Sequence, residues 1–166
     1  MSTIFCYTTT MTQSLTEPQL TAWRLFITAH ATLIEQIDEE LTAAGCIPLQ
    51  WYDVLVELVE APERRLRMSE LARRVVLSRS SLTHLADRLE AKGLLTRERV
   101  GTDRRGAYAV LTDQGYAALR QAWPLYARGI AQHFSRHLTE EETRMLADAF
   151  ARMLQAQGQQ DCGEDV

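Results

Sequence analysis

The chain has 166 residues, of which 46% are hydrophobic and 24% charged, a balance that suits one folded domain and excludes wholesale disorder. No apolar run approaches the roughly 18 residues of a membrane span, and the first ten residues contain no Lys or Arg, which argues against a secretory signal. The formal net charge is −4, but residues 63–105 carry +6 and the remaining residues −10, so the middle of the chain is the segment suited to binding a polyanion.

The first two predicted elements are helices rich in apolar residues. Thr16 and Gln19 have the spacing of a capping box, so the first helix is expected to begin at Thr16 and to end before Gly45. Its apolar residues recur at helical spacing, and the stripe that they form is broad for a helix on the surface of a monomer. A second helix is predicted over residues 48–60, where Pro62 prevents its continuation.

Two shorter helices are predicted in the basic middle of the chain. The first covers residues 68–76, with Ser69 or another neighbour of Met68 as its cap, and a tight turn follows at residues 77–78. The second covers residues 79–92 and ends at Gly93. Apolar residues on one of its faces predict the surface that packs on the first helix of the pair, and these are Leu82, Leu85, Ala86 and Leu89.

A β-hairpin is predicted after the second short helix. Residues 95–100 and 108–111 have the composition of strands, and they flank a segment that begins and ends with glycine. That segment, residues 101–106, includes the run Asp103-Arg104-Arg105. We therefore expect a hairpin with a basic tip.

Two helices complete the predicted fold. Thr112 is expected to cap a long helix that continues to about Phe134, and Pro124 inside it is expected to bend it. Thr139 and Glu142 form a second capping-box signal and open the last helix. The predicted fold class is therefore mainly α with a small β-hairpin wing.

Two short helices followed by a basic hairpin are typical of a winged helix-turn-helix, which binds double-stranded DNA. A helix with short polar side chains at its start fits the major groove, about 12 Å wide, and arginines on the hairpin would follow phosphates or enter a narrow minor groove. Either element alone would more often be a solvated amphipathic face, but their order and the local charge favour DNA. The candidate contacts are Arg79, Ser80, Ser81, Thr83, His84 and Arg88 on the helix, and Arg97, Arg99, Arg104 and Arg105 on the hairpin.

Residues from about Leu20 to Leu154 resemble the MarR (multiple antibiotic resistance regulator) family of bacterial repressors. Each motif that carries this resemblance is common alone, whereas the ordered set at these spacings is specific. The motifs are Ser69-Glu70-Leu71-Ala72, Ser78-Arg79-Ser80-Ser81-Leu82-Thr83, Asp87-Arg88-Leu89-Glu90-Ala91-Lys92-Gly93-Leu94-Leu95, Asp103-Arg104-Arg105 and Leu111-Thr112-Asp113-Gln114-Gly115.

The resemblance implies a homodimer and divides the chain into parts. Residues 16–46 and 112–156 would form a helical lobe shared by both copies, and residues 48–111 would form the winged motif. Each winged motif would bind one half of a palindromic operator, since two-fold dimers read two-fold sites. The whole domain would cover residues 16–156, between a flexible leader, residues 1–15, and a flexible acidic tail, residues 157–166.

The resemblance also implies roles for single residues. The family's wing pattern assigns Asp103 to pairing with an arginine that holds the wing, and Arg104 or Arg105 to the minor groove. By the same resemblance Arg88 lies near the DNA backbone and base edges. The base-reading positions are matched by Ser80, Ser81, Thr83 and His84.

Members of the family often bind small aromatic acids or phenols between the two lobes, which suggests a repressor released by such a ligand. We expect the cleft to lie between the first, second and fifth predicted helices, where all three tryptophans fall. Aromatic residues at helical spacing are also typical of a core, so this assignment has a structural alternative. The candidates are Trp23, His30, Trp51, Tyr52, Tyr116 and Trp123.

Two other interpretations of the function stay open. A winged helix can serve protein–protein contact, although such a module would prefer apolar residues where this chain has a basic wing and a polar helix face. An oxidant-responsive repressor would use Cys46, which precedes the N-terminus of the second helix but has no evident resolving partner. Cys6, Cys46 and Cys162 lie far apart and form no disulfide framework, which favours a cytoplasmic protein.

Catalysis and metal binding are not expected. The sequence contains no H-E-x-x-H, no G-x-S-x-G and no phosphate-binding glycine loop, so we predict neither an enzyme nor a cofactor. His133 and His137 are spaced to meet on one face of a helix, but two surface histidines are the more ordinary interpretation. Duplex DNA, a second copy of the chain and a small aromatic effector are the predicted partners, and a membrane is not.

Overall fold

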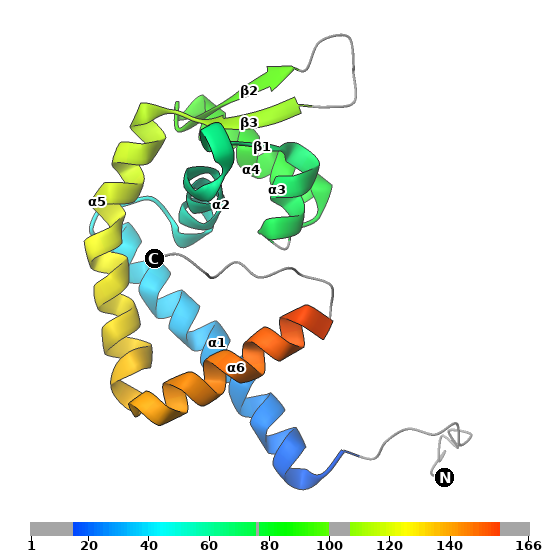
Figure 1. Cartoon of the computed structure of the whole chain (residues 1–166). Helices are drawn as coiled ribbons and strands as arrows, with labels where there is room; N and C mark the ends of the chain where they lie inside the picture. The colour runs from blue at the N-terminus through cyan, green and yellow to red at the C-terminus, as the bar shows by residue number, and fades with distance from the viewer. Residues whose placement is uncertain (1–14, 76, 100–106, 157–166) are drawn as a thin grey trace, which may run out of the picture.

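The computed structural model describes residues 15–75, 77–99 and 107–156 and arranges them as two lobes joined by a long helix (Figure 1). The winged lobe contains α2, α3, α4 and the sheet, and the lower lobe contains α1 and α6. The helices α2, α3 and α4 pack under a small sheet, whereas α1 and α6 cross below them and α5 runs along the side of both lobes. No helix among the described residues is long and apolar enough to cross a membrane. The elements in chain order are α1 (Glu17–Ala43), α2 (Leu49–Glu60), η1 (Pro62–Arg64), β1 (Arg65–Arg67), α3 (Met68–Arg74), α4 (Arg79–Ala91), β2 (Leu95–Arg99), β3 (Ala107–Leu111), α5 (Asp113–Gly129), η2 (Ile130–Phe134), η3 (Ser135–His137) and α6 (Glu140–Ala156).

The junction of α1 and α2 is closed by a side chain from the preceding helix. Thr16 and Gln19 form the predicted capping box at the start of α1, and Gly45 follows its end with φ of 72°. Pro48, the cap residue of α2, offers no side-chain hydrogen bond. Instead, the backbone N–H of Leu49 donates to Oδ1 of Asp38 at 2.6 Å, so α1 caps α2 and fixes the angle between them.

The sheet has three antiparallel strands in the order β1-β3-β2, one more than the predicted hairpin. The hairpin strands were predicted correctly, apart from their ends, but β1 was not foreseen. With only three residues, β1 is too short to show a clear alternation, and it exists because β3 supplies its hydrogen bonds. Leu66 is its buried residue and faces Ala109, so the strand closes the core of the winged lobe.

The helix-turn-helix forms at the predicted place. Ser78 caps α4, since its hydroxyl accepts from the N–H of Ser81 at 3.1 Å. Ser69, however, lies inside α3, whose cap residue is Arg67 and makes no side-chain cap bond. Of the two neighbours of Met68 offered as caps, Arg67 is therefore the one found, and because it belongs to β1 the chain passes directly from strand to helix.

The helix predicted up to about Phe134 is helical over that length, but it changes from α-helix to π-helix after Gly129. α5 begins after its predicted cap Thr112 and runs through Pro124 to Gly129, and a π-helical turn and a 3-10 turn then lead to α6. A Cβ placed on Gly129 would lie 3.0 Å from Cγ1 of Ile37, so glycine allows α5 to approach α1 closely there. One turn later His133 bonds through Nε2 to Oε1 of Glu40 on α1, at 2.7 Å.

Candidate nucleic-acid interface

The two faces of α4 divide as predicted. The apolar side chains Leu82, Leu85, Ala86 and Leu89 are buried in the core of the winged lobe. The candidate DNA contacts on the same helix are all exposed, and so is one acid between them: Arg79, Ser80, Ser81, Thr83, His84, Asp87 and Arg88. A polar face on a helix that is fixed in place by its opposite face is the arrangement needed to present side chains to base edges.

Hydroxyl groups gather at the start of α4. The Oγ of Ser78 lies 3.0 Å from that of Ser80 and 2.7 Å from that of Ser81. The hydroxyl of Thr83 donates to the backbone oxygen of Arg79 at 2.8 Å. These hydrogen bonds orient the small polar groups. The hydroxyls of Ser80, Ser81 and Thr83 keep capacity for a further partner, because each uses only one of its three hydrogen-bonding positions here, whereas Ser78 uses all three.

The register of the sheet sorts the arginines of the wing onto two faces. Arg97 lies opposite the buried Ala109, so it shares the inner face that packs on α4. Arg65 and Arg67 lie on the outer face, where their guanidinium carbons are 5.3 and 5.4 Å from the ring centroid of Tyr108. Arg65 and Arg67 were not among the predicted DNA contacts, because the three-residue strand that carries them is too short to show a clear alternation in the sequence.

Arg97 is held by carboxylates of α4. Its Nε and Nη2 lie 2.8 and 2.6 Å from Oε2 of Glu90, and Nη2 lies 2.7 Å from Oδ1 of Asp87. Hydrogen bonds to Glu90, with a further one to Asp87, raise the pKa of Arg97. Among the predicted phosphate contacts, this residue therefore has its charge directed toward protein groups.

Arg88 and Trp51, which were predicted to belong to separate sites, are in contact. The guanidinium carbon of Arg88 lies 5.4 Å from the ring centroid of Trp51, a cation–π distance. Trp51 is half-buried, and its Nε1 is buried without a hydrogen-bond partner in the described part of the chain. A side chain of α2 thus supports a candidate DNA contact on α4.

The wing tip itself, with Asp103, Arg104 and Arg105, lies outside the described residues. The predicted contact Arg99 ends β2, where its backbone pairs with Ala107. The roles assigned to these residues therefore stay predictions.

The six aromatic and histidine residues proposed for ligand binding line neither of the two cavities described below. Tyr52 is buried against Tyr126, with ring centroids 4.9 Å apart, whereas Trp123 is 53% exposed. Trp23 is 59% exposed on α1, and the ring of His30 lies 6.3 Å from that of Phe26. Within a single chain these side chains are spread over the core, the face of α4 and the outer surface of α1.

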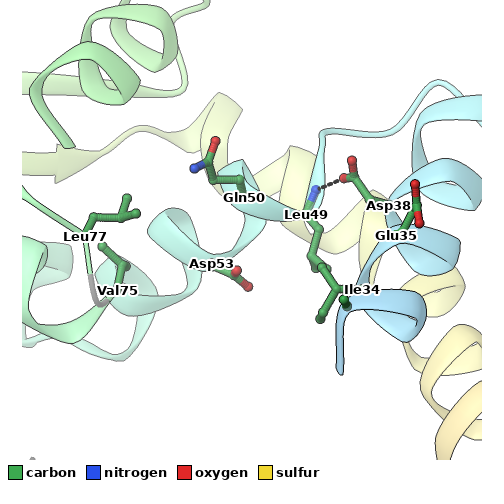
Figure 2. A pocket seen from close by; sticks show the side chains of 9 residues that line it. Ile34, Glu35, Asp38, Leu49, Gln50, Asp53, Val75 and Leu77 are labelled. Atoms are coloured by element: carbon green, nitrogen blue, oxygen red, sulfur yellow. Dashed lines mark hydrogen bonds between the residues drawn. The ribbon is translucent and has the colours of Figure 1, made fainter. Parts of the chain in front are cut away.

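A different set of residues lines a cavity of about 480 Å³ between α1, α2 and the α3–α4 turn (Figure 2). Three of its side chains are acidic and none is basic: the lining is Ala31, Ile34, Glu35, Asp38, Leu49, Gln50, Asp53, Val75 and Leu77. Although part of the Asp53 side chain reaches solvent, desolvation by the surrounding protein raises its pKa to about 6, and the charges of Glu57 and Asp38 add to the shift. Such a lining disfavours an anionic ligand.

The remaining candidates lie away from both the α4 face and this cavity. Cys46 is half-buried between α1 and α2 and is a free thiol, while Cys6 and Cys162 lie outside the described residues. His133 and His137 both line a second cavity beside α1, and His133 is bonded to Glu40. Within the described ranges, no three His, Cys, Asp or Glu side chains are placed to hold a metal ion.

Comparison with known proteins identifies the group to which this fold belongs. A family model described as MarR family matches residues 47–106. The transcriptional repressor MdtR of Bacillus subtilis is 31% identical over 144 residues, which cover 87% of this chain and 88% of MdtR. Among solved structures, Sco3205 of Streptomyces coelicolor, a MarR family regulator in complex with DNA, is 37% identical with a TM-score of 0.79 and covers 90% of this chain and 96% of its own. AbsC of Streptomyces coelicolor is 32% identical, also with a TM-score of 0.79, and covers 90% and 100%. The chain belongs to the MarR family of winged-helix transcriptional regulators.

Proposed function

We propose that this protein is a dimeric regulator that binds duplex DNA with α4 in the major groove and the wing beside it, and that it acts as a repressor. The observation that carries the proposal is the exposed polar face of α4, from Arg79 to Arg88, on a helix whose other face is buried. The DNA complex of Sco3205 and the repressor role of MdtR support it by similarity. A protein that regulates transcription by binding duplex DNA is expected in the cytoplasm, and this role requires no catalysis.

A homodimer is part of the proposal because the lower lobe leaves large apolar side chains in water. Monomeric proteins rarely expose apolar patches of more than a few hundred Å². A second copy would cover this surface and place two α4 helices about one turn of DNA, roughly 34 Å, apart, which fits a palindromic operator. The large apolar side chains that are exposed on α1 and α6 are Trp23, Leu25, Phe26, Ile27, Ile34, Met145, Met153 and Leu154.

A selection of DNA from a randomised pool tests the function. Recovered duplexes are expected to share an inverted repeat, and their affinity is expected to fall linearly with the logarithm of salt concentration. Arg104→Ala and Arg105→Ala should each flatten that slope by about one unit if they contact phosphate, whereas His84→Ala should change which duplexes are preferred. Recovery of no enriched sequence, with binding no tighter than that of a generic duplex, would contradict the proposal.

The proposal includes release from DNA by a small aromatic ligand at the junction of the lobes. A ligand releases DNA only if it prefers a conformation in which the two α4 helices are wrongly spaced. The acidic lining of the cavity beside Asp53 favours a phenol over an aromatic carboxylate there. Phenols and matched benzoates are therefore compared for quenching of tryptophan fluorescence and for weakening of operator binding. If neither class changes either signal, the ligand part of the proposal is wrong.

A further inference from the structure

The guanidinium of Arg97 joins the wing to α4 through the carboxylates of Glu90 and Asp87. Glu90 on α4 uses both oxygens for Arg97 on β2, because Oε1 accepts from the backbone N–H at 3.0 Å while Oε2 accepts from Nε and Nη2. Asp87, one turn earlier on α4, takes a second contact from Nη2. The fork geometry of arginine makes such a junction more specific than a single ion pair.

The register of the sheet and the spacing of residues on α4 together bring Arg97 next to Asp87 and Glu90. The register places Arg97 on the inner face of the sheet, opposite Ala109, and that face packs on α4. Residues three positions apart lie on the same side of a helix, so Asp87 and Glu90 face the strand together. The side chain of Arg97 is 31% exposed, and it lies between the strand and the helix.

The contact also alters the electrostatics of the DNA-binding face. Asp87 is the acidic residue among the exposed positions of α4 from Arg79 to Arg88, and its side chain is 49% exposed. A free carboxylate at this place would repel DNA phosphates. Arg97 neutralises it at a distance of 2.7 Å.

We propose that Arg97 is a positioning residue and not a phosphate contact: it locks β2 onto α4 through Glu90 and neutralises Asp87, so that helix and wing meet DNA as one unit. This inference rests on the proposed DNA-binding function. It separates Arg97 from Arg104 and Arg105, whose predicted role is direct contact with DNA.

The inference is tested by whether the substitution Glu90→Gln raises or lowers the affinity for DNA. Glu90→Gln removes a negative charge near the interface, so electrostatics alone predicts tighter binding of the selected palindromic duplex. Loss of the lock predicts the opposite, a loss of about tenfold in affinity. Glu98→Gln is the matched control, since Glu98 lies on the outer face of the same strand with a side chain 57% exposed, and it should bind as well as wild type or slightly better. Binding by Glu90→Gln as tight as that of wild type would overturn the inference.

Arg97→Lys and Arg97→Gln provide a second test that does not depend on Glu90. A lysine still binds phosphate as a point charge but cannot make the two-pronged contact with Glu90 and Asp87. If Arg97 is a positioning residue, both variants lose affinity and the salt slope stays that of wild type. The loss is somewhat larger for Arg97→Gln, which leaves the charge of Asp87 without a partner. If Arg97→Lys keeps wild-type affinity while Arg97→Gln lowers the slope by about one unit, Arg97 contacts phosphate and the inference is wrong.

The outcome for wild type separates this inference from the proposed function. Failure of the wild-type protein to bind any selected duplex would refute the DNA-binding function itself. Wild-type binding with an unaltered Glu90→Gln variant would refute only the lock. In the double variant Glu90→Gln/Arg97→Gln, the loss should be no larger than that of Arg97→Gln alone, because the lock is already broken and the second substitution only removes a negative charge near the DNA.

Discussion

The winged lobe and the lower helical lobe bury their apolar residues in different ways. In the winged lobe, Leu55, Leu58, Leu71 and Leu89 are fully buried within one chain. In the lower lobe, α6 has no buried residue among those described, and α1 buries only Ile37 and Leu41, near its junction with α2. The winged lobe therefore completes its core within one chain, whereas the lower lobe leaves the apolar faces of its helices exposed, as the proposed homodimer requires.

Local sequence defines the helices of the lower lobe even without a core. The hydroxyl of Thr139 accepts from the N–H of Glu142 at 3.2 Å, and the carboxylate of Glu142 accepts from the N–H of Thr139 at 2.8 Å. The backbone hydrogen bond from Thr139 is the main cause of the lowered pKa of Glu142. A capping box can thus specify where α6 begins, but it supplies no driving force for packing.

The largest effect is expected from a cavity in the self-sufficient lobe. Leu55→Ala removes a side chain with 0% exposure and should lower the free energy of unfolding by about 2–5 kcal/mol. Denaturant titration measures the change. The loss should be the same at all protein concentrations that keep the oligomeric state, and a loss below about 1 kcal/mol would show that this core is not as closely packed as described.

The next largest effect is expected on the association of two copies, and not on the stability of a single folded chain. Met153 on α6 is 60% exposed, so Met153→Asp on a monomer should change stability by only about 0.5 kcal/mol. If a second copy covers it, the dimer should weaken by about 2 kcal/mol, which is roughly thirtyfold in its dissociation constant. Sedimentation at several concentrations distinguishes these cases. An exposed polar residue on the same helix, Glu141, supplies the control substitution Glu141→Ala.

A smaller, pH-dependent effect is expected at the junction of the lobes. The pKa of Asp53 is raised to about 6 in the folded protein, above its ordinary value of 3.8, so the folded state binds the proton more tightly than the unfolded state. Its ionisation therefore opposes folding as pH rises from about 4 through 6. Asp53→Asn should stabilise the protein by about 1 kcal/mol at pH 7.5, a value reduced by solvent screening, and should have little effect at pH 4. Equal effects at both pH values would contradict the assigned pKa.

The smallest effect concerns the contact between Trp51 and Arg88. Trp51→Leu should weaken binding of the selected duplex about threefold, because a partly exposed cation–π contact contributes roughly 0.5–1 kcal/mol. Trp51→Phe keeps an aromatic face and should retain most of the affinity. Fluorescence anisotropy of the labelled duplex resolves the difference. Equal affinity in all three proteins would show that Trp51 does not support Arg88.

Much of the fold follows from signals within a few residues of one another. The capping boxes at Thr16 and Thr139, the cap at Thr112 and the terminating Gly45 mark helix ends correctly because each bond joins residues at most three or four positions apart. The buried leucines of α4 follow from a periodicity read along one helix. The outline of the winged motif and its polar face could therefore be predicted.

Partners far apart in the sequence were decided only by the tertiary structure. The strand β1 depends on hydrogen bonds from β3, the cap of α2 comes from Asp38, and the carboxylates that hold Arg97 belong to another element. The same is true of the contact between Trp51 and Arg88 and of the acidic cavity at Asp53. Sequence periodicity shows which face of an element is buried, but the crossing of helices and the register of strands determine which side chain faces which.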